Sequence, residues 1–263
     1  MQYWYKYRPD LWKRVELYEW DSHGVNRPKK QTPDEKLQAN IRRAARQIEA
    51  YALCNSWDWF GTFTLNSKYR DRSDLDSFRK DFMHLIRNNR RTFGDIEALL
   101  VPELHKSGDA WHIHGLIRGL PVEALRPFTL KEKLPEYIRK KLKGGEIVYD
   151  WSQYRNSFGW VDIEPIKNRD AAARYITKYI TKSAEDSTAK ALESGKHLYY
   201  VTRSLKLPER IETENASGVV PEAFPVGLMA GNTYSWQYGE VQWYETPKGH
   251  SIRSTGNGQE MKG

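Results

Sequence analysis

The sequence predicts an α+β fold with one main domain at residues 32–207. Three segments are rich in aromatic and β-branched residues, as strands are, and they span 57–66, 99–105 and 111–119. Helical segments that begin with capping residues and carry an apolar stripe precede, separate and follow these strands. A chain of 263 residues is long enough to bury a full core between the two kinds of element.

The helix that begins this domain has the clearest start signal in the chain. Thr32 can act as the N-cap, Pro33 suits the first helical position, and Glu35 can close a capping box. We expect this helix to run to about Leu53. A second helix follows Asp74, and its apolar stripe would pack on the sheet.

The other segments have weaker patterns. Residues 121–145 have a helical and strongly basic composition, and residues 146–166 are strand-like. We expect residues 1–31 to form an N-terminal arm and residues 208–246 a C-terminal extension in which a hairpin could form. Residues 247–263 are expected to be a disordered tail, because their composition cannot bury enough apolar surface to offset the entropy of ordering.

The composition indicates a polyanionic partner and a reducing compartment. Lys and Arg number 42 against 34 Asp and Glu, a net charge of +8, and neutralising phosphates with such residues releases counterions. The 10 Trp and 16 Tyr residues offer rings on which unpaired bases can stack. The single cysteine, Cys54, excludes an intrachain disulfide framework. Since the sequence has no long apolar run, we expect a cytoplasmic protein with no membrane partner.

Two histidines on one predicted strand form the first candidate site. His112 and His114 are spaced i, i+2, so their side chains project from the same face about 6.6–7 Å apart. That separation suits two imidazoles that converge on one metal ion. The pattern is also compatible with a strand whose two half-buried histidines are satisfied by hydrogen bonds.

A hairpin would add a carboxylate to the histidine pair. The short linker at residues 106–109 would fold the strand at 99–105 back onto the strand at 111–119. Glu103 would then lie beside the two histidines and could serve as a third ligand. Two imidazoles, one carboxylate and open positions are typical of a catalytic metal site. His105 lies on the same strand face as Glu103 and could replace it.

The second candidate site lies on the helix predicted at residues 169–182. We expect one arc of this helix to face the sheet, formed by the apolar residues Ala172, Ala173, Ile176 and Ile180. A separate arc, at positions i, i+3, i+4 and i+7, carries Tyr175, Lys178, Tyr179 and Lys182. The alternative to a catalytic role is a partly exposed helix whose tyrosines pack their rings and leave their hydroxyls in water.

Together, the two candidate sites make a single mechanism. A phenol can attack a phosphodiester and form a covalent phosphotyrosine link, which preserves the energy of the cut bond. A divalent ion at Glu103, His112 and His114 would polarise the phosphate and orient it for in-line attack. Lysines beside the phenols would favour the phenolate and offset the phosphate charge.

In its motifs and their order, the sequence resembles the rolling-circle replication initiators (Rep proteins) of the HUH endonuclease superfamily, named for a His-hydrophobic-His pair. Residues 60–65 resemble the first motif of that family, residues 111–115 the second, and residues 175–179 the third. The tyrosine pair is similar to that of the A-type initiators of small isometric phages, and the overall pattern to the filamentous-phage gene II protein. The resemblance covers about residues 40–205. It implies a central antiparallel sheet flanked by helices, with a ferredoxin-like or RRM-like topology.

The resemblance also implies a function and a role for each motif residue. The chain would be a metal-dependent, site-specific single-strand DNA endonuclease and strand-joining enzyme that acts through a 5′-phosphotyrosine. Tyr175 and Tyr179 become the nucleophiles and Lys178 a phosphate or tyrosine partner. The two histidines, with Glu103 as the third ligand, would hold Mg²⁺ or Mn²⁺.

The expected partner is single-stranded or extruded origin DNA in a bacterial host cell. Candidates for contact with the DNA backbone are the basic residues Arg42, Arg46, Arg174 and Lys182, although such residues also form ordinary solvated faces. The sequence has no Gly-x-x-x-x-Gly-Lys-Ser/Thr loop, so unwinding would need a host helicase. Two rival interpretations are a two-tyrosine transposase, which uses the same chemistry, and a non-catalytic origin-binding module.

Overall fold

The chain divides into two units, and each is described by itself. Residues Lys29–Lys206 form one unit, and Met1–Pro28 together with Leu207–Gly263 form the other. The computed structural model describes residues 2–17, 32–105, 108–183, 197–211, 221, 224, 228–236 and 239–245. All the candidate catalytic and metal-binding residues belong to the unit at residues 29–206.

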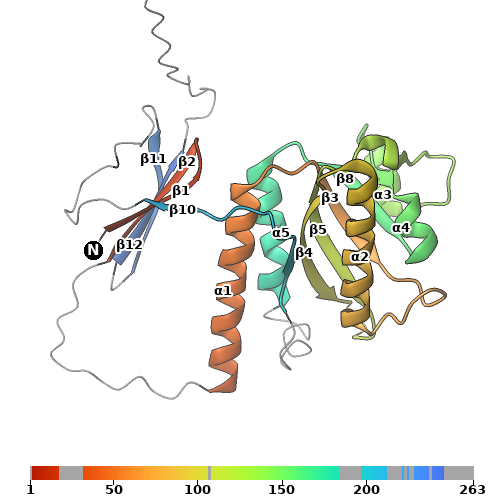
Figure 1. Cartoon of the computed structure of the whole chain (residues 1–263), viewed down its shortest axis with the longest axis horizontal. Coiled ribbons are helices and arrows are strands. Elements are labelled where there is room, and N and C mark those ends of the chain that lie inside the picture. The colour runs from red at the N-terminus through yellow and green to blue at the C-terminus, as the bar shows by residue number, and fades with distance from the viewer. Residues whose placement is uncertain are drawn as a thin grey trace, which may run out of the picture. The chain divides into compact units, whose positions relative to one another are not determined.

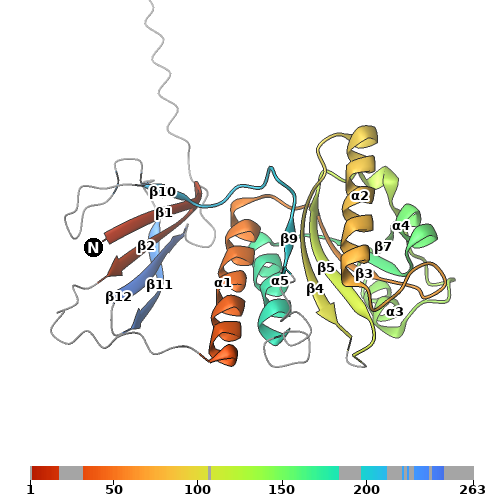
Figure 2. The ribbon, with the colours of Figure 1, turned by 60° about the horizontal axis from the view of Figure 1, so that its bottom comes forward.

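An antiparallel sheet of seven strands organises this unit (Figure 1, Figure 2). The strand order is β6-β7-β8-β3-β5-β4-β9. The strands are β3 (Trp59–Thr64), β4 (Glu97–Leu104), β5 (Trp111–Arg118), β6 (Arg126–Pro127), β7 (Tyr149–Asp150), β8 (Val161–Pro165) and β9 (Tyr200–Val201). As predicted, β4 and β5 form a hairpin, in which Glu103 pairs with His112.

The four central strands have a recognisable connectivity. They lie in the order β8-β3-β5-β4, and the chain passes through them as β3, β4, β5 and β8. Helix α2 (Leu75–Phe93) connects β3 to β4, and helix α4 (Ser152–Ser157) precedes β8. This is the β-α-β-β-α-β arrangement of ferredoxin-like folds. The predicted α+β fold, with a central antiparallel sheet flanked by helices, is therefore confirmed.

The first helix, α1 (Pro33–Cys54), starts where the sequence indicates. The Thr32 hydroxyl accepts a hydrogen bond from the Glu35 backbone N–H at 3.2 Å, and the Glu35 carboxylate accepts one from the Thr32 backbone N–H at 2.8 Å. Helix α2 begins at the N-cap Asp74 and ends at Gly94. In the part of the chain that the structure describes, no helix has the length and apolar character needed to cross a membrane.

The two faces of the sheet differ in chemistry. One face is apolar, and α2 and α4 cover it: Phe63, Ile113 and Ile163 of the strands share a buried core with Phe82 and Tyr154 of these helices. The other face meets helix α5 (Arg169–Ser183), which lies against β4 and β5 and beside α1 (Figure 2). Because side chains alternate along a strand, the two histidines of β5 both belong to this second face.

Two segments of this unit differ from expectation. Residues 121–145 are helical only in part, as the 3₁₀ turn Val122–Ala124 and α3 (Glu136–Lys143). Prolines at 127 and 135 explain this, because proline cannot donate the hydrogen bond that a helix interior requires. Residues 146–166 contain the helix α4 between the strands β7 and β8, and its six residues are too few to show a helical period.

The second unit corrects the expectation of an N-terminal arm at residues 1–31. Residues Gln2–Arg8 (β1) and Leu11–Leu17 (β2) are strands of a five-stranded antiparallel sheet, ordered β10-β1-β2-β12-β11. Its other strands are β10 (Glu209–Ile211), β11 (Met229–Trp236) and β12 (Gly239–Glu245). Trp4 and Trp12 are buried, with ring centres 5.2 and 5.3 Å from that of Phe224. β1 and β2 pair with each other, whereas their other partners, β10 and β12, lie near the opposite end of the chain and leave no local pattern around residues 2–17. The tail expected at 247–263 lies outside the described residues.

Candidate active site

Polar side chains from four neighbouring strands meet on the sheet face beneath α5. The register pairs Thr62 of β3 with Asp162 of β8 on one side and with His114 of β5 on the other. It also pairs His112 of β5 with Glu103 of β4. Because residues directly opposite each other on antiparallel strands share a face, these five side chains form one polar patch.

His114 is the most enclosed histidine of the patch, with 6% of its surface exposed. Its Nε2 lies 2.8 Å from Glu103 Oε2, and its Nδ1 lies 3.5 Å from Thr62 Oγ1. Since a carboxylate can only accept, Nε2 donates the proton in this arrangement. The hairpin therefore brings Glu103 into direct contact with the histidine pair.

His112 is held in a ligand-competent form. Its Nδ1 lies 2.8 Å from Thr64 Oγ1. Burial, reinforced by the neighbouring His114 and His105, lowers the pKa of His112 to about 4. The ring is therefore neutral near pH 7, and neutral imidazole is the form that binds metal ions. His105 is exposed, and its ring centre lies 5.3 Å from that of His112.

Helix α5 places both tyrosines over the histidine strand. The Tyr179 ring stacks on His114, with ring centres 3.5 Å apart and planes 13° apart. The Tyr179 hydroxyl donates a hydrogen bond to the Tyr175 hydroxyl at 2.8 Å. Tyr175 is 48% exposed, and its ring meets Phe60 edge-on at 5.0 Å. The two tyrosines thus also face the sheet, and Tyr175 is the more exposed of the two.

The protonation of Tyr179 differs from the sequence-based expectation. Burial raises the pKa of Tyr179 above its ordinary value, and the hydrogen bond to Tyr175 raises it further. Lys178, which was expected to favour the phenolate, is exposed. That expectation is therefore wrong for Tyr179 in this arrangement, because removing a phenol from water disfavours its charged form.

The donor set suits a divalent ion, although its members do not converge on one point. Within the described ranges, no group of three or more His, Cys, Asp or Glu side chains is arranged to hold a metal ion. Instead, His114 and Glu103 bond directly to each other. An ion held by these two residues and His112 would take the place of the proton between them. Two imidazoles and one carboxylate remain an appropriate set for such an ion.

The predicted DNA-contacting residues lie on two helices and are not gathered at the tyrosines. Arg174 is exposed on α5, and Arg42 and Arg46 are exposed on α1. Lys182 lies in α5, but its side chain is outside the described part of the chain. These are surface positions from which a phosphate backbone could be contacted.

A buried carboxylate beside the cluster was not singled out from the sequence. Asp162 is 3% exposed, and its Oδ1 accepts hydrogen bonds from the Tyr137 hydroxyl at 2.8 Å and from Trp160 Nε1 at 3.1 Å. Burial raises the pKa of Asp162. The composition of residues 159–164 indicates a strand, but it does not reveal that this strand lies beside β3 and brings Asp162 to Thr62.

A comparison with protein families finds one match that contains this whole cluster. Residues 58–184, slightly less than half of the chain, match the model of a family of replication-associated proteins, the ORF2 and gene II protein family. No curated protein and no solved structure matches the chain. The family match supports a replication-initiator-like protein with a role in replication initiation, and hence action on DNA.

Proposed function

From this family match and the geometry of the site, we propose that the chain starts rolling-circle replication by cutting and rejoining single-stranded DNA. The observation that carries the proposal is the stacking of Tyr179 on His114 at 3.5 Å, with the Tyr179 hydroxyl bonded to that of Tyr175. Two phenols, two imidazoles and the Glu103 carboxylate thereby occupy one end of one sheet face. That set of groups suits phosphodiester transesterification.

In the proposed reaction, a phosphodiester between two nucleotides is replaced by a phosphodiester between a tyrosine and the DNA. A phenolic oxygen of Tyr175 or Tyr179 forms a bond to phosphorus, and the bond from phosphorus to the 3′-oxygen breaks. The phenolic proton is released, and the departing 3′-oxygen takes up a proton. The product is a 5′-phosphotyrosine, from which a 3′-hydroxyl can later displace the phenol and rejoin the strand.

The strands supply the groups that would hold a divalent ion. Mg²⁺ or Mn²⁺, when bound, offsets charge on the phosphate and orients it. His112, His114 and Glu103 would be its ligands. Thr64 and Thr62 face Nδ1 of the two rings, at 2.8 and 3.5 Å, and such outer partners fix ring orientation.

The substrate in this proposal is single-stranded or extruded at the cut. The phenols lie between a helix and a sheet, and a duplex cannot easily present one phosphate there while its bases remain paired. Exposed arginines on α1 and α5 would contact the backbone around the cut. Unwinding of the duplex is assigned to a host helicase.

The test is the formation of a covalent adduct. The protein is incubated with a pool of randomised single-stranded oligonucleotides and Mn²⁺ or Mg²⁺, denatured, and separated by size. We expect a DNA-linked species that EDTA abolishes, and we expect mass spectrometry to place the nucleotide on Tyr175 or Tyr179. Tyr69→Phe, at a surface tyrosine of the same unit with 39% exposure, is the matched control and should form the adduct normally.

The alternative functions give different outcomes in this test. A non-catalytic origin-binding module would retain DNA without any adduct that survives denaturation. A two-tyrosine transposase would form the adduct but would transfer the linked end into an unrelated target strand. Adduct formation followed by joining to the strand's own 3′-hydroxyl supports the initiator.

A further inference from the structure

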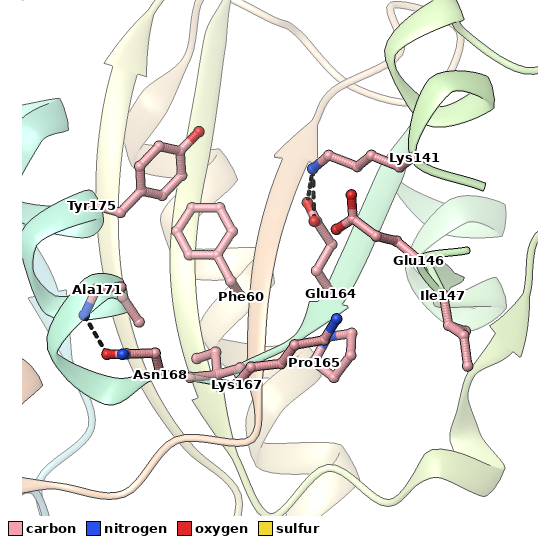
Figure 3. Close-up of a pocket in the computed structure, with 12 residues that line it drawn as sticks. Phe60, Lys141, Glu146, Ile147, Glu164, Pro165, Lys167, Asn168, Ala171 and Tyr175 are labelled. Atoms are coloured by element: carbon pink, nitrogen blue, oxygen red, sulfur yellow. Dashed lines mark hydrogen bonds and ion pairs between the residues drawn. The ribbon is translucent and has the colours of Figure 1, made fainter. Parts of the chain in front are cut away.

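A pocket of about 430 Å³ opens beside Tyr175, on the same sheet face as the candidate active site (Figure 3). Phe60 of β3 and Glu164 of β8, which are register partners, both line it. Lys141 enters from α3, and the first turns of α5 contribute Ala172 and Tyr175. Its volume falls in the range of about 300–1,000 Å³ that is common for small-molecule sites. The ring contact between Phe60 and Tyr175 makes the pocket continuous with the tyrosine pair.

The charges that line this pocket are balanced. Both carboxylate oxygens of Glu164 lie 2.6 Å from Lys141 Nζ. Glu146 and Lys167 add one charge of each sign. A phosphate in the pocket would meet two carboxylates, and the Lys141 ammonium is already engaged by one of them. The pocket therefore favours a group without net charge.

The remaining surface of the pocket suits a flat, partly apolar group. The rings of Phe60 and Tyr175 form one side, and Pro165, Ile166 and Ala172 supply aliphatic surface. Aromatic rings of this kind stack with unpaired bases in a way that tolerates any sequence. A neutral planar ring system is thus the ligand class that the walls accept.

The polar groups of the pocket can form hydrogen bonds with the edge of such a ring. Asn168 is committed to capping α5, because its Oδ1 accepts from the Ala171 backbone N–H at 2.9 Å. Lys141 and Glu164, one a donor and the other an acceptor, lie side by side on one wall (Figure 3). Every nucleobase carries a donor next to an acceptor on its Watson–Crick edge, and because their order and position differ between bases, a fixed donor and acceptor can discriminate among them.

We infer that this pocket holds one unpaired nucleobase, from a nucleotide next to the phosphate that is cut. The inference deepens the proposed function and rests on it, because the pocket shares Tyr175 with the candidate active site. Lys141 and Glu164 exchange their mutual contact for hydrogen bonds to the base edge. They are specificity residues, and the tyrosine and histidine residues carry the chemistry.

The experiment uses binding, so that it does not depend on cleavage. The full-length protein is mixed with randomised single-stranded oligonucleotides in EDTA, and the bound fraction is sequenced. We expect wild type to enrich one particular base at one position. An abasic nucleotide at that position should weaken binding about 5-fold or more, as loss of one stacked base does.

The variants disrupt the pair formed by Lys141 and Glu164 and leave the residues of the candidate active site unchanged. In Lys141→Met and in Glu164→Gln, the base preference at that single position should disappear while preferences elsewhere persist. Lys140→Met is the matched control, because Lys140 is exposed on the same helix and does not line the pocket. Thermal unfolding establishes that each variant is folded. If a single variant does not fold, the exchanged pair Lys141→Glu with Glu164→Lys should fold and prefer a different base.

Two results would overturn the inference: an unchanged preference in folded Lys141→Met and Glu164→Gln, or full-strength binding of the abasic strand. Failure of the proposed function would appear elsewhere, as the absence of any covalent adduct when wild type is given a metal ion. The binding profile and the adduct therefore report on the two proposals separately.

Discussion

His114 is surrounded by three groups of different chemistry. Glu103 lies 2.8 Å from its Nε2, Thr62 lies 3.5 Å from its Nδ1, and the Tyr179 ring covers its face at 3.5 Å. An ion that binds Nε2 of His114 must displace the Glu103 hydrogen bond. The residues assigned to the chemistry therefore also enclose the site.

At this scale, the two tyrosines can be tested one at a time. Because the hydroxyls of Tyr175 and Tyr179 lie 2.8 Å apart, either can reach a phosphate at nearly the same place. We expect Tyr175→Phe and Tyr179→Phe each to retain some adduct, in unequal amounts. The double variant should lose more than about 10³-fold, as enzymes do when the nucleophile is removed. If one single variant forms no adduct while the other matches wild type through repeated turnover, only one of the two tyrosines is a nucleophile.

The third metal ligand can be tested at the same scale. Glu103 contacts His114 directly, whereas His105 is exposed beside His112. We expect Glu103→Ala to lower metal-dependent adduct formation by at least about 10-fold, since even outer-shell partners of metal ligands contribute about 10–100-fold. His105→Ala should be milder. Titration of Mn²⁺ separates lost affinity from lost chemistry, and equal damage from both variants would count against Glu103 as the ligand.

At the scale of elements, two glycines with positive φ mark the end of a strand and the end of a helix. Gly119 directly follows β5 with φ +80°, and a Cβ there would lie 2.2 Å from the Asp95 carbonyl oxygen. Gly94, at the end of α2, has φ +91°, but a Cβ there meets no described atom within 4 Å. The two glycines share a positive φ and differ in the space around them.

These two positions give a matched pair of substitutions. Gly94 has φ +91° and ψ −152°, a region essentially restricted to glycine, so Gly94→Ala should lower the free energy of unfolding by about 1–3 kcal/mol. Gly119→Ala should exceed that loss by at least about 1 kcal/mol, because the added methyl must also displace backbone. Urea denaturation of both variants measures the difference, and equal losses would show that the Asp95 contact relaxes freely.

The short strand β9 allows a test of pH dependence. Burial raises the pKa of Tyr200 to about 12, so between pH 10 and 12 the unfolded chain loses this proton and the folded chain keeps it. The contribution of Tyr200 is thus fully present below pH 10 and is lost as the pH rises towards 12. Tyr200→Phe should remove roughly 1.4 kcal/mol of alkaline loss by pH 11, because one pKa unit corresponds to about 1.4 kcal/mol.

The comparison is made by denaturation of both proteins at pH 8 and at pH 11. At pH 8 the substitution should be close to neutral or slightly stabilising, since among the described residues the buried Tyr200 hydroxyl has no hydrogen-bond partner. Identical pH profiles for Tyr200→Phe and wild type would mean that the phenol ionises as easily in the folded chain as in the unfolded one.

At the scale of the whole molecule, the two units differ in which stretches of the chain form them. The unit with the candidate site is continuous, at Lys29–Lys206, whereas the other combines both ends of the chain. In the second unit, β2 pairs with β12 across more than 200 residues, for example Val15 with Val241. The candidate active site therefore lies on the seven-stranded sheet, whereas segments from the two ends of the chain pair in the five-stranded sheet.

This division predicts that residues 29–206 fold and cut without the other unit. The fragment contains the complete core of the seven-stranded sheet and every residue assigned to the site. We expect it to unfold cooperatively and to form the adduct with a short oligonucleotide, with any loss confined to affinity. Full-length protein with the same oligonucleotide is the control. A folded fragment that forms no adduct would show that the second unit supplies part of the site.

The sequence by itself determined the features that depend on near neighbours. The capping box of Thr32 and Glu35 forms within one turn, and the β4–β5 hairpin closes over a short linker, so composition and spacing were enough. The i, i+2 spacing of the histidines and the i, i+4 spacing of the tyrosines likewise follow from strand and helix periods. These features identified the residues that lie at the candidate site.

The tertiary structure alone decided which distant segments meet. The placement of β8 beside β3 brings in Asp162, the packing of α5 sets Tyr179 against His114, and α3 adds Lys141 to the wall of the pocket. The strands at 2–17 pair with each other, and their other partners lie near the opposite end of the chain. Pairings of this kind depend on the shape and burial of surfaces that form only after the chain folds, so they leave no periodic signal in the sequence around either partner.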